Sequence, residues 1–314
     1  MDSTSDYAPG VEGRRVEAHR SRLLERLTEP STLLKLLASA EGRLECTPGD
    51  PVLRRRRAEF LRALGDLDGA LDAYAALSAE GAGDEATGRC AAVLSGRTPV
   101  DGPGPGLAPF VRVEGLLNAD QLALLWRTVS GPDACLQAAG VFGEGGPTIN
   151  PGVRQARIME HTEALSGWFL PIVEAVIDRE HALSRLGLSP FAVTRRELQV
   201  TRHEAGGFYR MHRDAGPKAS SRYLTYVYYF HREPRRFTGG DLLLFDQTAG
   251  GARSDLTAFT RIRPIHNSML LFASDRLHAV SRVEADGPDP LDGRWTVNGW
   301  LHRAPLCAVG EQAS

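Results

Sequence analysis

The residues with the clearest chemistry are two histidines and one aspartate. His212-Arg213-Asp214 form an H-x-D tripeptide, and His278 follows Asp214 by 64 residues. Two histidines and one carboxylate are the ligand set that holds non-haem Fe(II) and leaves three coordination positions open. Open positions are what an oxygen-activating metal site requires. The H-x-D tripeptide alone is weak evidence, so the residues around it decide the interpretation.

His212 and Asp214 can reach one metal ion if this segment of the chain is extended. Residues i and i+2 of an extended chain point to one face, and the turn Gly206-Gly207 precedes the segment. His278 comes after the apolar run Met269-Leu270-Leu271-Phe272 and a short turn. A ligand at the end of a separate strand would close the site between strands. The sequence therefore predicts His212, Asp214 and His278 as metal ligands and catalytic residues.

Arg294 is the candidate anchor for an anionic ligand. The positions of Arg294 and Asn298 differ by an even number, so the two side chains share one face of a predicted strand. A buried arginine requires an anionic partner, and its planar fork suits a carboxylate. Asn298 could add a hydrogen bond, and the Tyr229 hydroxyl on a neighbouring strand could complete a cradle for a dicarboxylate. The alternatives are an exposed arginine and a tyrosine that only packs in the core.

Short strands are the elements expected to position these residues. Aromatic and apolar runs alternate with turns from residue 197 onward, which is typical of strands. Candidate strands are 110–113, 197–203, 222–230, 241–245, 268–272 and 295–301, and candidate helices are 119–129, capped by Asn118, and 163–179. Residues 140–151 are rich in Gly and Pro and are predicted to be a loop. This order predicts an α+β fold: a double-stranded β-helix (jelly roll) with supporting helices.

The first 97 residues are expected to be an all-α region. Apolar residues recur at helical spacing over 58–77, on both sides of Leu64-Gly65-Asp66. This run resembles a tetratricopeptide repeat, and 84–94 could begin a second one. Gly102-Pro103-Gly104-Pro105-Gly106 is the clearest linker. We predict a helical-repeat region at 1–97, a linker at 98–106 and the β-helix domain at 107–314. The helices are either a structural extension or a docking surface for a protein or peptide.

The amino-acid composition argues against two classes of partner, nucleic acids and membranes. A hydrophobic content of 42%, a charged content of 24% and a net charge of −2 give no case for nucleic acid or an anionic membrane. The chain has no apolar run of about 18 residues, and its N-terminus lacks the pattern of a secretory signal. The four cysteines form no C-x-x-C, which indicates a reducing compartment. We predict a cytoplasmic protein with no nucleic-acid or membrane partner.

Four segments together resemble a known family. GGFYRMHRD, RYLTYVYYFHREPRRFTGGDLLLFD, the strand ending in His278 and GRWTVNGWL are similar to Fe(II)/2-oxoglutarate-dependent oxygenases of the prolyl-4-hydroxylase-like superfamily. The resemblance covers roughly 107–303 and is dense over 197–303. It implies that His212, Asp214 and His278 bind iron, and that Arg294 forms a salt bridge with the distal carboxylate of 2-oxoglutarate with help from Tyr229.

Other positions carry over less directly. Asn298 falls where some members have a threonine that touches the cosubstrate, and Gly239-Gly240 matches a structural turn of the family. His203 stands where many relatives have a tyrosine. The step from His278 to Arg294 is longer than is common, with 284–292 as an apparent insertion, so Arg282 is the alternative anchor. The intact Asp214 favours hydroxylation over halogenation.

The resemblance implies Fe(II), 2-oxoglutarate and O2 as cofactor and cosubstrates, with ascorbate as a stimulant. The expected reaction hydroxylates an unactivated C–H bond and releases succinate and CO2. The leading substrate is a prolyl, peptidyl or amino-acid side chain, and a small secondary-metabolite intermediate is the alternative. Loops at 140–150 and 248–254 are expected to select it. Two other classes stay open: a non-catalytic helical-repeat adaptor, and a cupin-like zinc or manganese protein.

Overall fold

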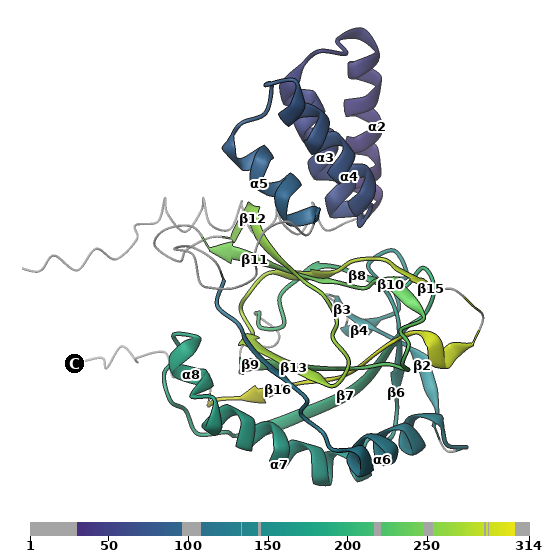
Figure 1. Ribbon diagram of the computed structural model, residues 1–314, viewed down its shortest axis with the longest axis vertical. Helices are drawn as coiled ribbons and strands as arrows, with labels where there is room; N and C mark the ends of the chain where they lie inside the picture. Colours follow the sequence, from purple (N-terminus) through teal and green to yellow (C-terminus); the bar gives the residue numbers. More distant parts are fainter. Residues whose placement is uncertain are drawn as a thin grey trace, which may run out of the picture.

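The computed structural model describes residues 30–95, 108–132, 134–143, 146–216, 221–247, 254–285, 287 and 289–304. These residues form four layers, in which helices cover the outer face of each of two facing sheets (Figure 1). This arrangement confirms the predicted α+β fold with two antiparallel sheets. The predicted linker 98–106 and most of the loop 248–254 lie outside the described residues. The domain boundaries therefore stay predictions.

The part of the chain from residue 30 to 95 is helical, as predicted. Its helices are α2 (Pro30–Cys46), α3 (Pro51–Leu64), α4 (Leu67–Ala79) and α5 (Glu85–Leu94). The turn predicted at 64–66 is confirmed. Gly65 ends α3 with a left-handed φ of 86°, and the Asp66 side chain accepts the Gly69 N–H at the start of α4. The assignment of these helices to a repeat family stays a prediction.

The larger sheet has the strand order β1-β13-β9-β16-β7-β6-β2 and is antiparallel throughout. Its strands are β1 (Val111–Glu114), β2 (Leu136–Ala138), β6 (Arg157–Met159), β7 (Arg195–His203), β9 (Arg222–Phe230), β13 (Ser268–Ala273) and β16 (Arg294–His302). The strands predicted at 110–113, 197–203, 222–230, 268–272 and 295–301 are confirmed to within two residues. The strand pattern of the sequence therefore predicted five of the seven strands, and it missed the short strands β2 and β6.

The smaller sheet has the order β12-β11-β14-β8-β5. Its strands are β5 (Arg154–Gln155), β8 (Phe208–His212), β11 (Leu242–Gln247), β12 (Ser254–Ile262) and β14 (His278–Val280). The strand predicted at 241–245 is β11, whereas β12 was not predicted. The register between the two shifts after Phe245, where Asp246 pairs with Asp255 although Phe245 pairs with Phe259. This irregularity breaks the apolar alternation by which a strand is recognised.

Residues 140–151 are not only a loop, which corrects the prediction. They contain a hairpin of β3 (Val141–Gly143) and β4 (Gly146–Thr148). The apparent insertion at 284–292 is also structured, since β15 (Val283–Ala285) pairs with β10 (Phe237–Gly239) and a 3-10 turn covers Pro290–Asp292. Glycine and proline in these short segments leave no alternation to detect.

Helices α6 (Ala119–Ser130), α7 (Glu163–Arg179) and α8 (Ala182–Arg185) cover the outer face of the larger sheet (Figure 1). The predicted cap is confirmed, because Asn118 and Gln121 form a capping box at the start of α6. The core beneath these helices joins Phe169 of α7 to Tyr226 and Tyr228 of β9 and Trp295 of β16, all fully buried. None of the described helices is both long and apolar enough to cross a bilayer.

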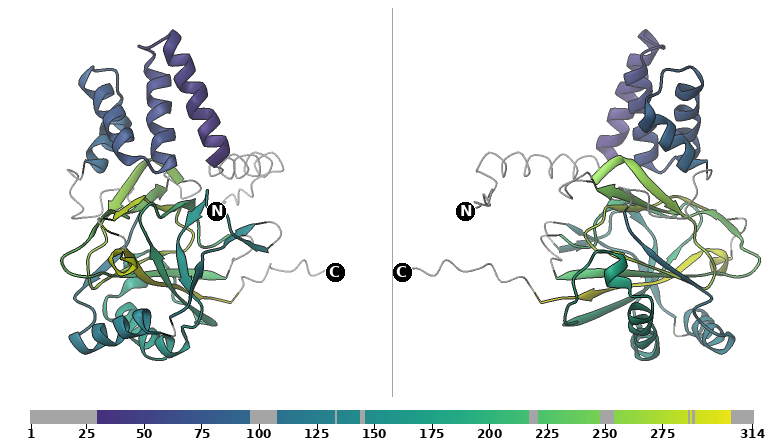
Figure 2. Two further views of the ribbon diagram at one scale, coloured as in Figure 1. Left: turned by 90° about the vertical axis from the view of Figure 1, so that its right-hand side faces the viewer. Right: turned by 60° about the vertical axis from the view of Figure 1, so that its left-hand side comes forward.

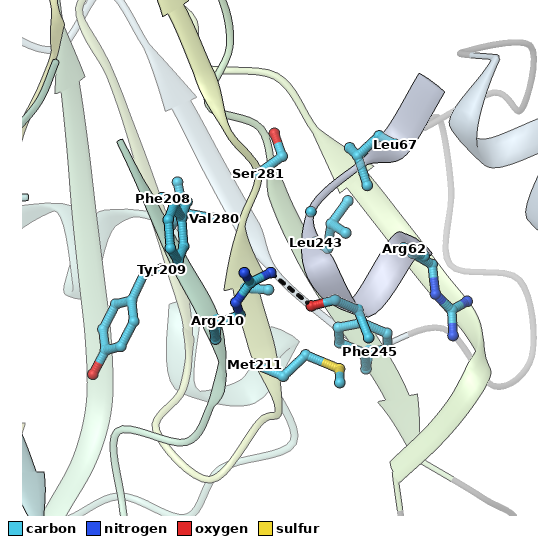
Figure 3. Close-up of a pocket in the computed structure, with 13 residues that line it drawn as sticks. Arg62, Leu67, Phe208, Tyr209, Arg210, Met211, Leu243, Phe245, Val280 and Ser281 are labelled. Carbon is cyan, nitrogen blue, oxygen red and sulfur yellow. Dashed lines mark hydrogen bonds between the residues drawn. The ribbon is translucent and has the colours of Figure 1, made fainter. Parts of the chain in front are cut away.

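Helices α3, α4 and α5 pack on the outer face of the smaller sheet, opposite to α6–α8 (Figure 2). Tyr74 and Leu94 of this layer share one core with Phe245, Phe259 and Leu277. Arginines of the sheet also reach the C-terminal carbonyls of two helices, where a positive charge is favourable. Arg210 donates to the Ala63 carbonyl at 3.1 Å, drawn as the dashed line in Figure 3, and Arg261 donates to the Leu94 carbonyl.

The strands present their other faces to the region between the two sheets, here called the cleft. The odd positions of β9, such as Tyr229 and Val227, belong to a core shared with Leu244 and Phe272, whereas its even positions pack under α7. The predicted split of this strand into two faces is therefore confirmed. Polar side chains that point into the cleft lie among these apolar residues, and they include every predicted site residue.

The packing of the helices on the smaller sheet can be tested at Leu277, which is 5% exposed and belongs to this core. We expect Leu277→Ala to lower the free energy of unfolding by about 2–5 kcal/mol, because it leaves a cavity in packed surroundings. Leu124→Ala, at a position that is 39% exposed, is the matched control and should change it by less than about 0.5 kcal/mol. Urea unfolding measures both, and equal losses would contradict the packing.

Candidate metal centre

His212 and His278 face each other across two hydrogen-bonded strands. They are register partners where β8 pairs with β14. The next pair is Tyr209 with Val280, so β8 uses three steps where β14 uses two. This bulge places Tyr209 and His212 on the same face, and their rings stack with centroids 3.5 Å apart. The ring centroids of His212 and His278 are 4.1 Å apart.

Asp214 completes the group from the loop after β8. Its Oδ1 lies 3.7 Å from Nε2 of His212, and its Oδ2 lies 3.6 Å from Nε2 of His278. All three ligand atoms lie within 4.8 Å of one another. The predicted three residues are thus brought together, two from adjacent strands and one from the following loop.

Thr225 fixes the Asp214 carboxylate from the opposite sheet, a role that the sequence did not indicate. Its hydroxyl donates to Oδ2 of Asp214 at 2.8 Å and lies 2.9 Å from the hydroxyl of Ser274. Thr225 stands on β9 among buried residues. A threonine in an aromatic strand carries no sequence signal of this kind, because its partner is set by the facing of the two sheets.

Backbone carbonyls orient both histidines. Nδ1 of His212 lies 2.7 Å from the Arg210 carbonyl, and Nδ1 of His278 lies 2.9 Å from the Arg276 carbonyl. A carbonyl only accepts, so each Nδ1 carries the proton and each Nε2 offers its lone pair. Both lone pairs are on the side of Asp214. This is the arrangement in which a histidine binds a metal through Nε2 while its other nitrogen is held in place.

The electrostatics of the group also suit a cation. Burial lowers the pKa of His212 to about 3, and the charge of His278 acts in the same direction. Burial opposes ionisation of Asp214, but the neighbouring imidazoles of His278 and His212, together with hydrogen bonds from Trp300 and Thr225, hold the pKa of Asp214 below its ordinary value. A neutral imidazole beside an ionised carboxylate is the protonation state that a divalent metal requires. Imidazole and carboxylate donors fit Fe(II).

A second group of ligating residues, His231, Glu233 and His266, is less suited to a metal. Nδ1 of His266 accepts the backbone N–H of His231 at 3.1 Å, so its Nε2 carries a proton rather than a lone pair. Nδ1 of His231 lies 2.9 Å from the Arg232 carbonyl. These hydrogen bonds hold the backbone near His231 in place. A substitution in this second group is a matched control for one in the first group.

Arg294 begins β16 and is buried in the cleft, with 2% of its surface exposed. Its Nε donates to the Gly240 carbonyl at 2.6 Å, and its guanidinium lies 5.0 Å from the centre of the Tyr229 ring. A Cβ on Gly240 would come within 2.5 Å of Arg294 Cδ, so only glycine fits there. Arg282, the alternative anchor, is exposed and donates to the Gly206 carbonyl instead.

Two polar atoms beside Arg294 have no hydrogen-bond partner of normal geometry among the described residues: the Tyr229 hydroxyl and Nε2 of His203. His203 pairs with Arg294 in the register of β7 and β16, and its Nδ1 lies 3.4 Å from Arg294 Nη1. Arginine only donates, so Nδ1 accepts and Nε2 carries the proton. Arg294, Tyr229 and His203 thus offer N–H and O–H donors to one buried position. Unsatisfied buried donors require an acceptor, and a carboxylate fits.

Asn298 lies on the same face of β16, as predicted, but its oxygen is engaged. Oδ1 accepts from the hydroxyls of Thr201 at 2.8 Å and Thr296 at 3.2 Å. Its amide nitrogen is the group that can donate to a ligand. A role for Asn298 at the cosubstrate stays a prediction.

Similarity to known proteins covers the part of the chain that contains His212, Asp214, His278 and Arg294. Residues 198–302 match the family model of the 2OG-Fe(II) oxygenase superfamily. An uncharacterized PKHD-type hydroxylase of Synechocystis sp. is 42% identical over 123 residues, which are 38% of this chain and 41% of that protein. The match therefore spans less than half of the relative's length.

Solved structures with a similar arrangement include a Pseudomonas putida prolyl-4-hydroxylase, at a TM-score of 0.43 and 19% identity, covering 63% of this chain and 94% of that one. A Trichoplax adhaerens prolyl hydroxylase in complex with a hypoxia inducible factor peptide fragment gives 0.42 and 20%, covering 62% and 84%. The non-heme alpha ketoglutarate dependent epimerase SnoN from nogalamycin biosynthesis gives 0.37 and 18%, covering 66% and 87%.

The buried state of His203 predicts a pH dependence of stability. Burial, then the charges of Arg294 and Arg154, hold its pKa well below the ordinary value of about 6.5. His203 therefore stays neutral in the folded protein at a pH where it is protonated in the unfolded chain. The free energy of unfolding decreases as the pH falls below about 6.5.

We therefore expect His203→Gln to gain stability relative to the wild type as the pH falls from about 7.5 to 5. The gain is at most about 2 kcal/mol, since one proton changes stability by about 1.4 kcal/mol per pH unit. Urea unfolding of metal-free protein measures it. His161→Gln, at an exposed position, should follow the wild type at both pH values. A constant difference between wild type and His203→Gln would contradict the prediction.

Proposed function

We propose that this chain, which carries a domain of the 2OG-Fe(II) oxygenase superfamily at residues 198–302, is an Fe(II)- and 2-oxoglutarate-dependent dioxygenase. It hydroxylates an unactivated C–H bond. The observation that carries the proposal is the pairing of two features in one cleft. Three donor atoms face one another with their lone pairs free, and the buried Tyr229 hydroxyl and His203 Nε2–H beside Arg294 have no acceptor among the described residues.

His212, Asp214 and His278 would hold the iron. The Arg210 and Arg276 carbonyls keep both imidazoles in the tautomer that binds through Nε2, and Thr225 keeps the Asp214 carboxylate in place. Fe(II) with 2-oxoglutarate and O2 supplies the oxidising power, and succinate and CO2 are released. The protein contributes a rigid ligand set and a cleft that excludes bulk water. Ascorbate would stimulate the enzyme by keeping the iron reduced.

Arg294 would bind the distal carboxylate of 2-oxoglutarate, with the Tyr229 hydroxyl and His203 Nε2–H as further donors. Burial of these three side chains favours this assignment over Arg282, because a carboxylate is held most strongly where water does not compete. Asn298 would add a donor on the same face. The complete ligand set and this cradle together favour an oxygenase over a non-catalytic adaptor or a cupin-like protein.

The substrate is proposed to be an amino-acid, prolyl or peptidyl side chain, with a small secondary-metabolite intermediate as the alternative. The similar proteins include prolyl hydroxylases, one of them in complex with a peptide, and an epimerase of nogalamycin biosynthesis. Docking of a protein or peptide on α2–α5 and a cytoplasmic location are part of the same proposal. The scattered cysteines support the location.

The iron ligands can be tested with a matched pair of histidines. We expect His278→Ala to weaken Fe(II) binding by more than about 100-fold, because it removes a ligand outright, and to abolish succinate release. His266→Ala, in the second histidine group, should retain both. Anaerobic Fe(II) titration with 2-oxoglutarate, followed by its charge-transfer absorption, measures binding. Retained Fe(II) binding in His278→Ala would show that the ligand set is wrong.

The cosubstrate anchor can be tested with a matched pair of arginines. Arg294→Met should weaken 2-oxoglutarate binding by more than about 100-fold, since it leaves a buried carboxylate without its charged partner, while Fe(II) binding persists. Arg282→Met should leave 2-oxoglutarate binding within about twofold of the wild type. Titration of 2-oxoglutarate into the Fe(II) protein measures both. Equal losses of metal and 2-oxoglutarate binding in Arg294→Met would indicate a structural role.

A further inference from the structure

Arg154 is a second arginine of the cleft, placed at the edge of the smaller sheet. It pairs with Tyr209 in the register of β5 and β8, so the two side chains share the inner face. The Arg154 guanidinium lies 4.8 Å from the centre of the Tyr209 ring, and that ring stacks on His212. Only one aromatic ring therefore separates Arg154 from a proposed iron ligand.

The hydrogen bonds of Arg154 are weak for a half-buried cation. Nη2 donates to Oε1 of Gln199, on the opposite sheet, at 3.2 Å, and Nη1 donates to the Gly140 carbonyl at 3.3 Å. Both acceptors are neutral, both distances are long, and Nε is buried without a partner. Burial lowers the pKa of Arg154, while interactions with Tyr209 and then Asp214 act against this.

Ion pairing distinguishes Arg154 from the arginines near it. Arg222 forms an ion pair with Glu197, which Arg195 shares, and Arg202 forms one with Glu204, which Arg157 shares. Arg154 has no carboxylate at ion-pairing distance among the residues that the structure describes. With iron and 2-oxoglutarate bound, the charges of the metal and Arg294 would be balanced by Asp214 and the two carboxylates of 2-oxoglutarate. The positive charge of Arg154 would then still lack a counter-charge.

We propose that Arg154 binds a carboxylate of the substrate, so that the substrate of this enzyme is a free amino acid or another small carboxylic acid. This inference rests on the proposed function. Arg154 is one guanidinium without a carboxylate partner among the described residues, and its planar fork matches the two oxygens of a carboxylate. An internal prolyl residue of a peptide has no carboxylate of its own. The proposed role of Arg154 therefore favours a free amino acid or another small acid over a peptidyl substrate.

The contacts of Arg154 suit this role. A carboxylate would accept charge-assisted hydrogen bonds, which are shorter and stronger than those to Gln199 and Gly140. The substrate carboxylate would then be anchored one ring away from His212, and the carbon chain attached to it would extend towards the metal. Gln199 would move from acceptor of Arg154 to neighbour of the bound acid.

The test uses acetate as a minimal carboxylate on the full-length protein loaded with Mn(II) and saturating 2-oxoglutarate. Mn(II) broadens the signal of 13C-labelled acetate held near it, so weak binding is measurable. We expect saturable broadening of acetate and none of acetamide, which has the same shape without the charge. Arg154→Gln should weaken acetate binding by about tenfold or more. Arg157→Gln is the control. Arg157 lies on β6, the next strand along the chain, its side chain is exposed, and the variant should bind acetate as the wild type does.

The outcomes separate the two proposals. Equal broadening by acetate and acetamide, or equal acetate binding in wild type and Arg154→Gln, would overturn the role of Arg154. Arg154→Lys, which keeps the charge and loses the planar fork, should lie between wild type and Arg154→Gln. If the wild type bound neither Mn(II) nor 2-oxoglutarate, the proposed function itself would be contradicted. A final comparison of N-acetylproline, its amide and a proline-containing peptide should show binding of the free acid only, and preference for the peptide would favour a peptidyl substrate.

Discussion

The site depends on one backbone constraint, the pairing of His212 with His278 across two short strands. β14 has only three residues, and the bulge in β8 decides on which face His212 appears. A shift of the register by one residue would turn the imidazole to the other face of the sheet. The register must therefore be fixed by contacts outside the strands themselves, because so few ladder hydrogen bonds cannot specify it.

The N-terminal helices supply many of these contacts. Met211, Leu277 and Ala279 are the chain neighbours of the two histidines, and all three pack in the core under α3–α5. Arg210 joins the layers through its backbone and its side chain, since its carbonyl holds Nδ1 of His212 and its guanidinium holds the Ala63 carbonyl. Figure 3 shows Arg210 and Met211 directed to the helical side and Tyr209 directed away from it. The helical layer thus braces the strands that carry the ligands, which is more than an attached docking module would do.

The sequence predicted what depends on local pattern. The H-x-D tripeptide, the alternation of β16 and the aromatic run of β9 pointed to residues that the structure brings together: His212, Asp214 and His278 in one group, and Tyr229 beside Arg294 in another. It did not predict β12, whose alternation is broken by an irregular register, or the bond from Thr225 to Asp214, which spans the two sheets. Arg154 was also missed, because it lies in a two-residue strand, where one arginine of many has no distinguishing pattern.

The two arginines of the cleft differ in a way that matches different ligands. Arg294 is held by the Gly240 carbonyl at 2.6 Å and by the Tyr229 ring, and no residue larger than glycine fits at position 240. Such a rigid, buried anchor suits a cosubstrate whose position must be the same in every turnover. Arg154 is held by two long bonds to neutral oxygens, which a carboxylate can replace at little cost. A firmly held charge and an exchangeable one would therefore give 2-oxoglutarate and substrate separate places around one metal in the proposed enzyme.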